Sequence, residues 1–391
     1  MSPRIFFSVG EPSGDLHAAR LMHCLRQQSP SAEFVGFGGE RMQQAGCELA
    51  YPLTELAVVG FVEVLPKLRE FFRVADIASD IFQKSKPDAV VLVDFPGFNW
   101  HIAKRAKQHG IPVFYYLPPQ LWAWGQWRVN KMRRTVDHVL CNLPFEQTWF
   151  EEHGVPSHYV GHPFFDEVQE RVLDSRFLSR WLDSSKLQVA VLPGSRSREV
   201  KNIWPLQLEV IRRLARKHPN AKFHVAALKD AHCLWCKQQL QAEDRDLDIN
   251  FFVGKTSEVI QMADCALAKS GSVSLELMAR TAPTVIIYHV GRIMYQIAKR
   301  LTSLQSITLP NMLAGRVVMK EFLAVGSDPT AMESSLQALD NLLSDAGERA
   351  KQRAELWELK NQFAVGGAST RAAAKILELL AEPKANQVRV A

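Results

Sequence analysis

The sequence predicts an α/β fold with two Rossmann-like domains that face a cleft. Short apolar runs alternate with helical patterns, which is typical of buried parallel strands joined by crossover helices. This alternation stops at Gly-His-Pro, residues 161–163, and starts again near residue 188. The 391 residues leave room for two domains of about 150 residues each. Two similar halves are therefore the simplest interpretation.

The first half has the element order of one such domain. Residues 4–9 are predicted as a strand, residues 10–14 as a turn and residues 15–27 as a helix. Further strands are predicted at residues 34–37, 89–93, 113–116 and 136–140. They are short and apolar, as strands buried on both faces are. We expect this domain to span residues 1–165.

The second half repeats the pattern. A polar helical stretch over residues 166–185 is expected to link the halves, and residues 204–217 are expected to form a helix. Strands are predicted at residues 188–192, 222–226, 249–253, 265–268 and 284–289. We expect a second domain over residues 186–355 and a helical tail up to residue 380. Ligands of such folds bind at the carboxyl ends of strands, so the turns that follow strands are the first candidates for a site.

Charge and composition narrow the class of protein. Hydrophobic residues make up 47% and charged residues 23%, which excludes a disordered or fibrous chain. The formal net charge of +6 favours anionic partners: nucleic acid, phosphorylated metabolites or an anionic membrane surface. No run of about 18 apolar residues occurs, so no spanning segment is expected. The amino terminus lacks the apolar core of a signal peptide and six cysteines make no disulfide framework, so we expect a cytosolic protein with reduced thiols.

The clearest chemical signal is the sequence Ser270, Gly271, Ser272, which follows a predicted strand and opens a helix. Small residues allow a ligand close to the backbone, and the first N–H groups of a helix attract anions. Glu276 falls one turn into that helix, where it could hold ribose hydroxyls. A capping box with Ser272 or Ser274 as N-cap would explain one serine but not the cluster. We favour a nucleotide diphosphate site.

A second turn, at Gly194, Ser195 and Arg196, follows the strand at residues 188–192. Its backbone N–H groups and the Arg196 guanidinium suit a phosphate. The alternative is a plain strand-to-helix turn with a solvated charged face, since further charged residues follow directly. We favour the phosphate contact.

A glycine-rich loop in the first half suits an acceptor. The loop GEPSGD, residues 10–15, lacks the GxGxxG pattern of a dinucleotide site but could receive a sugar through Glu11 or Asp15. For Asp15 alone, a role as N-cap of its own helix is the preferred interpretation.

Asp94 is the candidate general base. It follows four apolar residues and begins the segment DFPGFN, residues 94–99. A carboxylate at the end of a central strand, beside a cleft, suits proton abstraction. A turn Asp before Pro96-Gly97 explains the residue equally well. Both interpretations of Asp94 stay open.

Other metal and nucleotide patterns are weaker. The GKT at residues 254–256 imitates the end of a P-loop but lacks the upstream glycine. The DRD at residues 244–246 imitates a metal-binding pair, and we interpret it as a solvated loop. Cys233 and Cys236 have no second pair of ligands at finger spacing. We therefore predict no metal and no cofactor.

Two segments combine apolar and basic residues. Residues 56–72 are rich in Val, Leu and Phe with cations nearby, which suits either a membrane interface or a core helix. Trp122, Trp124 and Trp127 stand next to a run of basic residues. Nucleic acid could bind such a patch, but a core helix with one solvent-exposed face is the preferred interpretation. We predict no nucleic-acid partner.

Taken together, the motifs resemble one family, the lipid-A-disaccharide synthases. Ten matching segments run in the family's order between residues 10 and 311. They are GEPSGD (10–15), GFGGERM (36–42), VVGFVEVL (58–65), DFPGFN (94–99), WAW (122–124), LPFE (143–146), VGHP (160–163), LPGSR (192–196), SGSVSLE (270–276) and LPN (309–311). Each motif alone is weak, but ten in order are highly specific.

The resemblance implies a GT-B fold and an inverting glycosyltransferase. The family transfers 2,3-diacylglucosamine from UDP onto 2,3-diacylglucosamine 1-phosphate (lipid X) and forms a β-1,6 bond. The resemblance places the acceptor lipid on the amino-terminal domain and UDP-2,3-diacylglucosamine on the carboxyl-terminal domain. It also implies a peripheral protein on the cytoplasmic face of the inner membrane of a Gram-negative bacterium. Helices within residues 360–391 are expected to pack back on the first domain or on the partner subunit of a homodimer.

The family's functional residues map onto positions of this chain. Asp94 is expected to be the base, with Glu11 as the other candidate. The expected nucleotide-sugar contacts are Gly194, Ser195, Arg196, Ser270, Gly271, Ser272, Glu276 and Asn311, and the expected acceptor contacts are Ser13, Gly14 and Asn99. Three departures bear on acceptor fit and acyl-chain preference: Gly125 where the family usually has Arg, LPPQ at 117–120, and no Pro before Glu at 319–321.

Two other functions stand beside the transferase. The same fold serves UDP-N-acetylglucosamine 2-epimerases, which need no lipid acceptor. A nucleotide-sugar-binding protein that docks on a membrane without catalysis is the second alternative. An Asp94 carboxylate together with an intact Ser-Gly-Ser turn argues against the second alternative.

Overall fold

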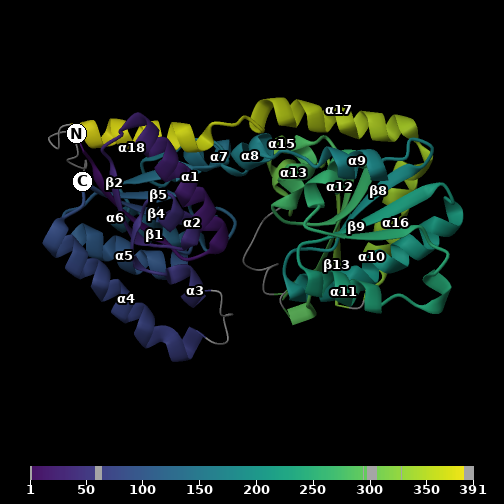
Figure 1. The fold of residues 1–391 in the computed structure, drawn as a ribbon, viewed down its shortest axis with the longest axis horizontal. Helices are drawn as coiled ribbons and strands as arrows, with labels where there is room; N and C mark the ends of the chain where they lie inside the picture. The colour runs from purple at the N-terminus through teal and green to yellow at the C-terminus, as the bar shows by residue number, and fades with distance from the viewer. Residues whose placement is uncertain (1, 58–63, 294, 297–305, 327, 383–391) are drawn as a thin grey trace. The chain divides into compact units, whose positions relative to one another are not determined.

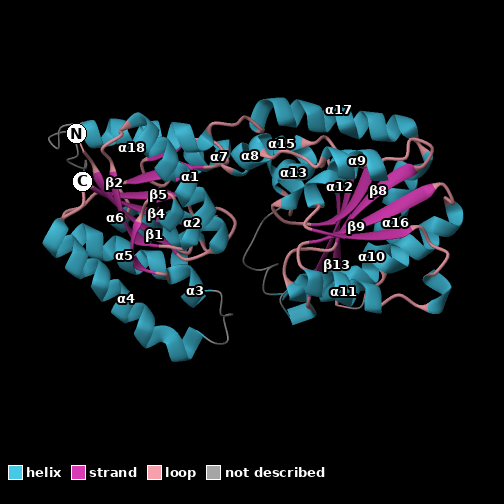
Figure 2. Cartoon of the chain, viewed as in Figure 1, coloured by secondary structure: helices cyan, strands magenta, loops and turns pink. Residues whose placement is uncertain are grey.

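The computed structural model describes residues 2–57, 64–293, 295–296, 306–326 and 328–382. The chain divides into two compact units, Met1–Asp166 with Gly366–Ala391, and Glu167–Val365. Each unit is built on a parallel sheet that is covered by helices (Figures 1 and 2). The predicted fold class, an α/β protein with two Rossmann-like domains, is confirmed.

The first unit contains a seven-stranded parallel sheet. Its strands are β1 (Arg4–Val9), β2 (Glu33–Phe37), β3 (Glu48–Tyr51), β4 (Ala89–Val93), β5 (Val113–Tyr116), β6 (His138–Cys141) and β7 (Ser157–Tyr159). They lie in the order β3-β2-β1-β4-β5-β6-β7, with neighbours parallel. The order reverses between β1 and β4, which is the switch point where such sheets bind ligands.

Helices lie on both faces of this sheet, and the last helix before the second unit, α8 (Phe164–Glu170), crosses the boundary between the units. They are α1 (Pro12–Gln28), α2 (Glu40–Gln44), α3 (Leu53–Ala57), α4 (Val64–Ser85), α5 (Pro96–Gln108), the 3-10 helix η2 (Gln126–Arg128), α6 (Val129–Thr135), α7 (Pro144–Glu152), α8 (Phe164–Glu170) and α18 (Ala368–Ala381). One core forms against α4 and α5, and a second forms against α1 and α18. The central strands therefore contribute alternate side chains to two different cores.

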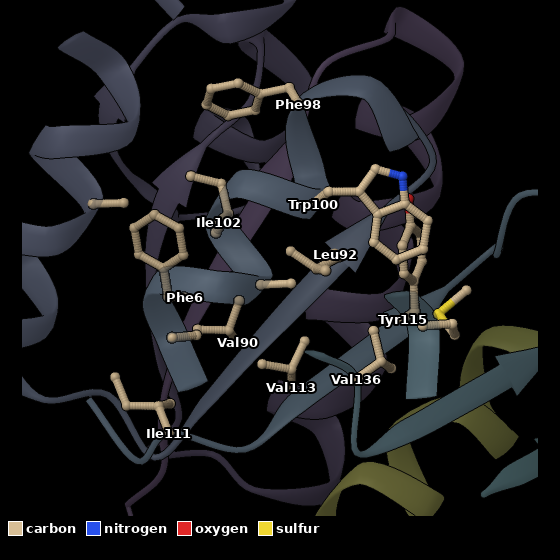
Figure 3. Packing of buried hydrophobic residues seen from close by; sticks show 14 of the residues in the cluster. Phe6, Val90, Leu92, Phe98, Trp100, Ile102, Ile111, Val113, Tyr115 and Val136 are labelled. Atoms are coloured by element: carbon tan, nitrogen blue, oxygen red, sulfur yellow. The ribbon is translucent and has the colours of Figure 1, made fainter. Parts of the chain in front are cut away.

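Figure 3 shows part of the core between α5 and the sheet. Val90 and Leu92 of β4 point into this core, while their neighbours Val91 and Val93 enter the other one. The Trp100 ring meets the Tyr115 ring edge to face, with centroids 5.8 Å apart. Burial on both faces explains why residues 89–93 form an unbroken apolar run.

The second unit contains a six-stranded parallel sheet. Its strands are β8 (Leu187–Leu192), β9 (Ala221–Ala227), β10 (Ile249–Val253), β11 (Cys265–Lys269), β12 (Thr284–Val290) and β13 (Lys320–Val325). The order is β10-β9-β8-β11-β12-β13, so the switch point lies between β8 and β11. The helices are α9 (Ser175–Trp181), α10 (Ser197–Lys217), α11 (Asp230–Gln238), η3 (Ala242–Asp244), α12 (Thr256–Met262), α13 (Val273–Ala279), α15 (Leu309–Ala314), α16 (Thr330–Ser344) and α17 (Ala346–Phe363).

The last helix returns to the first unit. Figure 1 shows α18, in yellow, beside the purple α1 of the same chain. The Asp166 carboxylate accepts the N–H groups of Ala368 and Ser369 at 3.0 and 2.9 Å, and so caps the start of α18. The Arg371 Nε donates to the Val160 carbonyl at 2.8 Å. Residues far apart in the sequence thus close the second core of this unit.

Several element boundaries differ from the predictions. Strands β1, β4, β5 and β10 have the predicted bounds, but β6 begins at His138 rather than at residue 136. Helix α1 starts at Pro12 rather than at residue 15, because Pro is well suited to the first turn of a helix. Strands β3, β7 and β13 were not predicted, since none of them is a fully buried apolar run.

Glu146 is a carboxylate enclosed by the first unit. It lies in α7, is completely buried, and accepts hydrogen bonds from the Trp122 Nε1 at 2.9 Å and from the Leu143 N–H at 3.1 Å. Burial raises its pKa from 4.5 to about 7, and these hydrogen bonds only partly oppose that shift.

Trp124 and Trp127, which the sequence predicts in a core helix, are exposed, so that interpretation is wrong for those two residues.

We predict that Glu146 makes the free energy of unfolding fall as pH rises. Because its folded pKa exceeds the ordinary value, the folded protein binds more protons than the unfolded chain between pH 4.5 and about 7. The contribution of Glu146 is full below pH 4.5 and lost above about 7, a change of up to about 3 kcal/mol. Urea unfolding of the wild type and Glu146→Gln across this range measures the difference.

The comparison with Glu146→Gln is needed because buried histidines act in the opposite sense. Burial lowers the pKa of His17 and His224 to about 4 and that of His162 to about 3. Their contributions are shared by the wild type and the variant, and cancel in the difference. A difference curve that stays flat from pH 4.5 to 7 would contradict the buried-acid assignment.

Candidate active site

Two turns of the second unit lie at the ends of neighbouring strands. Strands β8 and β11 pair at the switch point, with Leu192 beside Ala268. The turn after β8 contains Gly194, which has a φ of 123°, a conformation that side chains rarely adopt. A Cβ at this position would lie 3.0 Å from Glu199, so the glycine also leaves room for that side chain.

A carboxylate and an ammonium group join these two turns. The Lys269 Nζ, at the end of β11, lies 2.9 Å from the Glu199 Oε1. The Glu199 Oε2 accepts the N–H groups of Ser195 and Arg196, each at 3.3 Å. Burial alone would raise the pKa of Glu199, but Lys269 and the two N–H groups outweigh it and hold the pKa below its usual value. Glu199 is therefore an anion that organises the first turn.

The Ser-Gly-Ser turn leaves polar groups at the surface. Ser270 is buried, whereas Gly271 and Ser272 are exposed. The Ser274 hydroxyl donates to the Gly271 carbonyl at 2.7 Å, while the Ser272 hydroxyl makes no capping hydrogen bond to α13. The start of α13 is thus fixed by Ser274, and the Ser272 hydroxyl faces solvent.

Arg196 and Glu276 have different surroundings. The Arg196 side chain is 80% exposed, with its Nη1 4.0 Å from the Glu199 Oε1. Such an arginine can swing onto a phosphate with little loss of internal contacts. The Glu276 side chain is only 8% exposed, and its Oε1 accepts a hydrogen bond from the Arg280 Nε at 3.0 Å. The Gln261 Oε1 in turn accepts from the Arg280 Nη1 at 2.9 Å.

Asn311 holds a loop rather than facing solvent. Its Nδ2 donates to the Met319 carbonyl at 2.7 Å and to the Glu321 Oε1 at 2.6 Å. Its Oδ1 accepts the N–H groups of Val318 and Met319 at 2.8 Å. The carboxylate of Glu321 also accepts the Thr308 N–H at 2.9 Å, at the start of α15. Asn311 therefore fixes the segment between α15 and β13.

In the first unit, Asp94 sits at the switch point in a strained conformation. Asp94 and Phe95 have φ angles of 48° and 46°, which side-chain-bearing residues seldom adopt in succession. Val93, the residue before them, pairs with Val9 at the end of β1. The Phe95 ring covers Gly10, where a Cβ would approach it to 2.2 Å. Only glycine at position 10 allows the two turns to pack in this way.

Two buried side chains hold the Asp94 backbone. The Asn99 Nδ2 donates to the Asp94 carbonyl at 2.7 Å, and the Tyr115 hydroxyl donates to the same carbonyl at 2.9 Å. The Asn99 Oδ1 accepts the Ser8 hydroxyl at 2.7 Å. Burial, and then the nearby charge of Asp94, raises the pKa of Tyr115 well above its usual value, so the hydroxyl keeps its proton. These hydrogen bonds thereby tie together the ends of β1, β4 and β5.

The GEPSGD loop lies beside Asp94 at the same sheet edge. Glu11 is the half-buried N-cap residue of α1, Ser13 is exposed in its first turn, and Gly14 packs on the strand ends. The prediction of Asp15 as the N-cap of its own helix is wrong. The Asp15 carboxylate instead accepts the Gly39 N–H at 2.8 Å, at the start of α2.

The weaker metal pattern has a structural explanation. Asp244 is buried, and its carboxylate accepts hydrogen bonds from the Arg212 Nε and Nη2 at 2.8 and 2.7 Å. The solvated-loop interpretation is therefore wrong for Asp244. Within the described ranges, no three His, Cys, Asp or Glu side chains gather as they would around a metal ion.

No helix in the part of the chain that the structure describes is long and apolar enough to cross a membrane.

Known proteins share this sequence over almost its whole length. A family model described as lipid-A-disaccharide synthetase matches residues 5–376. The chain is 37% identical over 385 residues to a lipid-A-disaccharide synthase of Aromatoleum aromaticum, covering 97% of both chains. It is 35% identical over 382 residues to the one of Anaeromyxobacter sp. (strain K), covering 97% of this chain and 98% of the relative.

The chain belongs to the lipid-A-disaccharide synthase family. This membership confirms the predicted enzyme class, a glycosyltransferase. The solved UDP-GlcNAc 2-epimerase of Neisseria meningitidis, bound to UDP-GlcNAc, has the same fold, with a TM-score of 0.65 over 97% of this chain and 100% of that one. Its sequence is only 12% identical, so the likeness concerns the fold and not the reaction.

Four organising residues of this family member were missed in the sequence: Lys269, Glu199, Tyr115 and Glu321. Lys269, Tyr115 and Glu321 were hidden because their partners lie 10 or more positions away in the sequence. Two local signals were available. Lys269 is a charged residue directly after the apolar run of residues 265–268, and Glu199 stands three residues after Arg196, the spacing of a capping box.

We predict that Asn99→Ala destabilises the first unit. The substitution leaves the Asp94 carbonyl with one donor fewer and the buried Ser8 hydroxyl without its acceptor. Each buried group left unsatisfied costs about 1–3 kcal/mol. Urea unfolding measures the loss, with Asn130→Ala as control, because Asn130 contacts Arg133 on the surface. Equal stability of the two variants would contradict the role assigned to Asn99.

Proposed function

We propose that the protein transfers 2,3-diacylglucosamine from UDP to the 6-hydroxyl of 2,3-diacylglucosamine 1-phosphate, with inversion. The observation that carries this proposal is the match to the family model over residues 5–376. The relatives at 35% and 37% identity, matched over nearly their full lengths, support the same activity. The products are a β-1,6-linked disaccharide 1-phosphate and UDP.

Asp94 is the proposed general base. Its carboxylate takes the proton from the acceptor 6-hydroxyl as that oxygen bonds to the anomeric carbon. The bond between the anomeric carbon and the UDP oxygen breaks, and the electron pair leaves with UDP. The left-handed backbone at residues 94 and 95 supports this role, since strained residues gather at functional sites. Asn99 and Tyr115 then position the base, and the acceptor contact predicted for Asn99 becomes an indirect one.

The leaving diphosphate is the proposed ligand of the second unit's turns. The exposed Arg196 guanidinium can pair with a phosphate, and the exposed Ser272 offers a hydroxyl for a hydrogen bond. The N–H groups of Gly271 and its neighbours stabilise the charge that develops on UDP, while the Ser195 N–H already donates to Glu199. Glu276 is the proposed ribose contact, held by Arg280, and Asn311 shapes the site through its loop.

The decisive experiment supplies both acylated glucosamine substrates to the purified protein. The expected outcome is release of UDP together with a disaccharide 1-phosphate detected by mass spectrometry, with neither formed when one substrate is omitted. A parallel incubation with UDP-N-acetylglucosamine alone tests the epimerase alternative. Conversion of that sugar to its 2-epimer without any disaccharide from the lipid substrates would overturn the proposal.

We predict that Asp94→Asn lowers kcat by about 100-fold or more, because general-base catalysis contributes about that factor. The affinity for UDP should stay within about twofold, since Asp94 contacts the acceptor and not the nucleotide. Glu11→Gln is the matched control, as a carboxylate on the neighbouring turn. Wild-type turnover by Asp94→Asn, with a large loss in Glu11→Gln, would move the role of base to Glu11.

A membrane surface is the proposed source of both lipids. Along α4, the exposed Arg69, Phe72 and Arg73 share one helical face. An aromatic ring beside cations suits an anionic lipid surface, here the cytoplasmic face of the inner membrane. Residues 58–63, which belong to the segment predicted for this contact, lie outside the described residues.

We predict that Arg69→Glu combined with Arg73→Glu reduces binding to anionic vesicles. Each basic residue near such a surface contributes about 1 kcal/mol, so the loss should exceed tenfold. Co-sedimentation with phosphatidylglycerol vesicles measures it. Lys351→Glu with Arg353→Glu, on the exposed face of α17, makes the same change of net charge elsewhere. Equal losses in the two double variants would show that only net charge matters.

A further inference from the structure

We propose that Lys269 is a positioning residue for the nucleotide diphosphate, acting through its ion pair with Glu199. The inference rests on the proposed function, in which the two turns after β8 and β11 hold that diphosphate. Lys269 would fix the separation of the turns and neutralise the carboxylate that lies between them. Lys269 lies outside the family motifs at residues 192–196 and 270–276.

The ion pair connects both turns through one carboxylate. The Lys269 Nζ lies 2.9 Å from one oxygen of Glu199. The other oxygen accepts the N–H groups of Ser195 and Arg196, which belong to the turn after β8. Lys269 itself is the residue directly before Ser270, at the start of the other turn. A movement of either turn would therefore stretch this chain of contacts.

The Lys269 ammonium group lies next to the Ser-Gly-Ser turn. A Cβ placed on Gly271 would be 3.7 Å from the Lys269 Nζ, so the side chain folds back along the turn that follows it. The Nζ is also 5.5 Å from the centroid of the Tyr288 ring, which attracts a cation through its π face. The side chain is only 14% exposed. The ion pair with Glu199 and the contact with the Tyr288 ring thus hold one positive charge beside the proposed anion.

The charge of Lys269 matters because Glu199 is an anion. A carboxylate that binds the N–H groups of a turn also repels a phosphate that approaches the same turn. Lys269 balances this charge, so the turn keeps its shape without repelling the ligand. Removing Lys269 alone should therefore weaken the binding of a diphosphate more than the binding of an uncharged nucleoside. An ion pair that only stabilises the fold would affect both ligands equally.

The test compares UDP, UMP and uridine by isothermal titration calorimetry. For Lys269→Gln we expect UDP affinity to fall about 10- to 100-fold, the range for losing a charged partner. UMP should be weakened less, and uridine by no more than about twofold. Lys255→Gln is the matched control, because Lys255 also pairs with a carboxylate, Asp174 at 2.7 Å, and lies 5.4 Å from the centroid of the Phe177 ring. Lys255 follows β10, at the edge of the same sheet.

A second variant tests the charge balance itself. In the double variant Lys269→Gln with Glu199→Gln, the unbalanced carboxylate is gone and two amides can still bond to each other. UDP affinity should recover by about threefold or more relative to Lys269→Gln, a non-additive effect of neighbouring residues. Additive losses in the double variant would overturn the role assigned to charge balance.

The outcomes distinguish this inference from the proposed function on which it rests. A wild-type protein that binds neither UDP nor uridine would refute the proposed nucleotide site, and the inference with it. A wild type that binds UDP while Lys269→Gln keeps the same affinity, or weakens UDP and uridine alike, would refute the inference alone. Selective loss of UDP in Lys269→Gln, absent in Lys255→Gln, would support it.

Discussion

The candidate site residues of both units depend on one constraint, the reversal of strand order in a parallel sheet. In the first unit the reversal lies between β1 and β4, and in the second it lies between β8 and β11. Helices leave the two central strands in opposite directions at these points, so the turns that follow the strands are not covered by a crossover. Asp94 and Glu11 follow one such pair of strands, and Arg196 and Ser270 follow the other. The sheet topology therefore decides where the candidate site residues lie.

Buried or half-buried polar side chains fix turns and loops in both units. Asn99, Glu199, Asn311 and Glu321 each bond to backbone groups of a turn or helix start. A flexible turn would lose conformational entropy on binding a ligand, and a turn that is already fixed loses less. The exposed residues at the same places, such as Arg196 and Ser272, remain available. The turns of the second unit therefore carry two classes of polar residue, those that hold the turns and those that are proposed to meet a ligand.

The sequence predicted the parts of the fold that rest on local patterns. The central strands were predictable because burial on both faces requires an unbroken apolar run, as at residues 89–93. Edge strands such as β3 and β7 are half-exposed or only three residues long, and their pattern does not differ from a loop. The site motifs were visible as small and charged residues after strands. The holding contacts were not, because the Asn99 side chain meets Ser8 across 91 positions of sequence.

The conformation of Asp94 shows why such long-range contacts matter for chemistry. A left-handed backbone costs about 1–2 kcal/mol at each residue with a side chain, and residues 94 and 95 both adopt it. The two hydrogen bonds from Asn99 and Tyr115 to the Asp94 carbonyl contribute about 0.5–1.5 kcal/mol each, which is the same order. The two hydrogen bonds therefore offset a large part of the strain. A fixed backbone limits the directions open to the Asp94 carboxylate, which is what the proposed general base needs to reach one hydroxyl of a sugar.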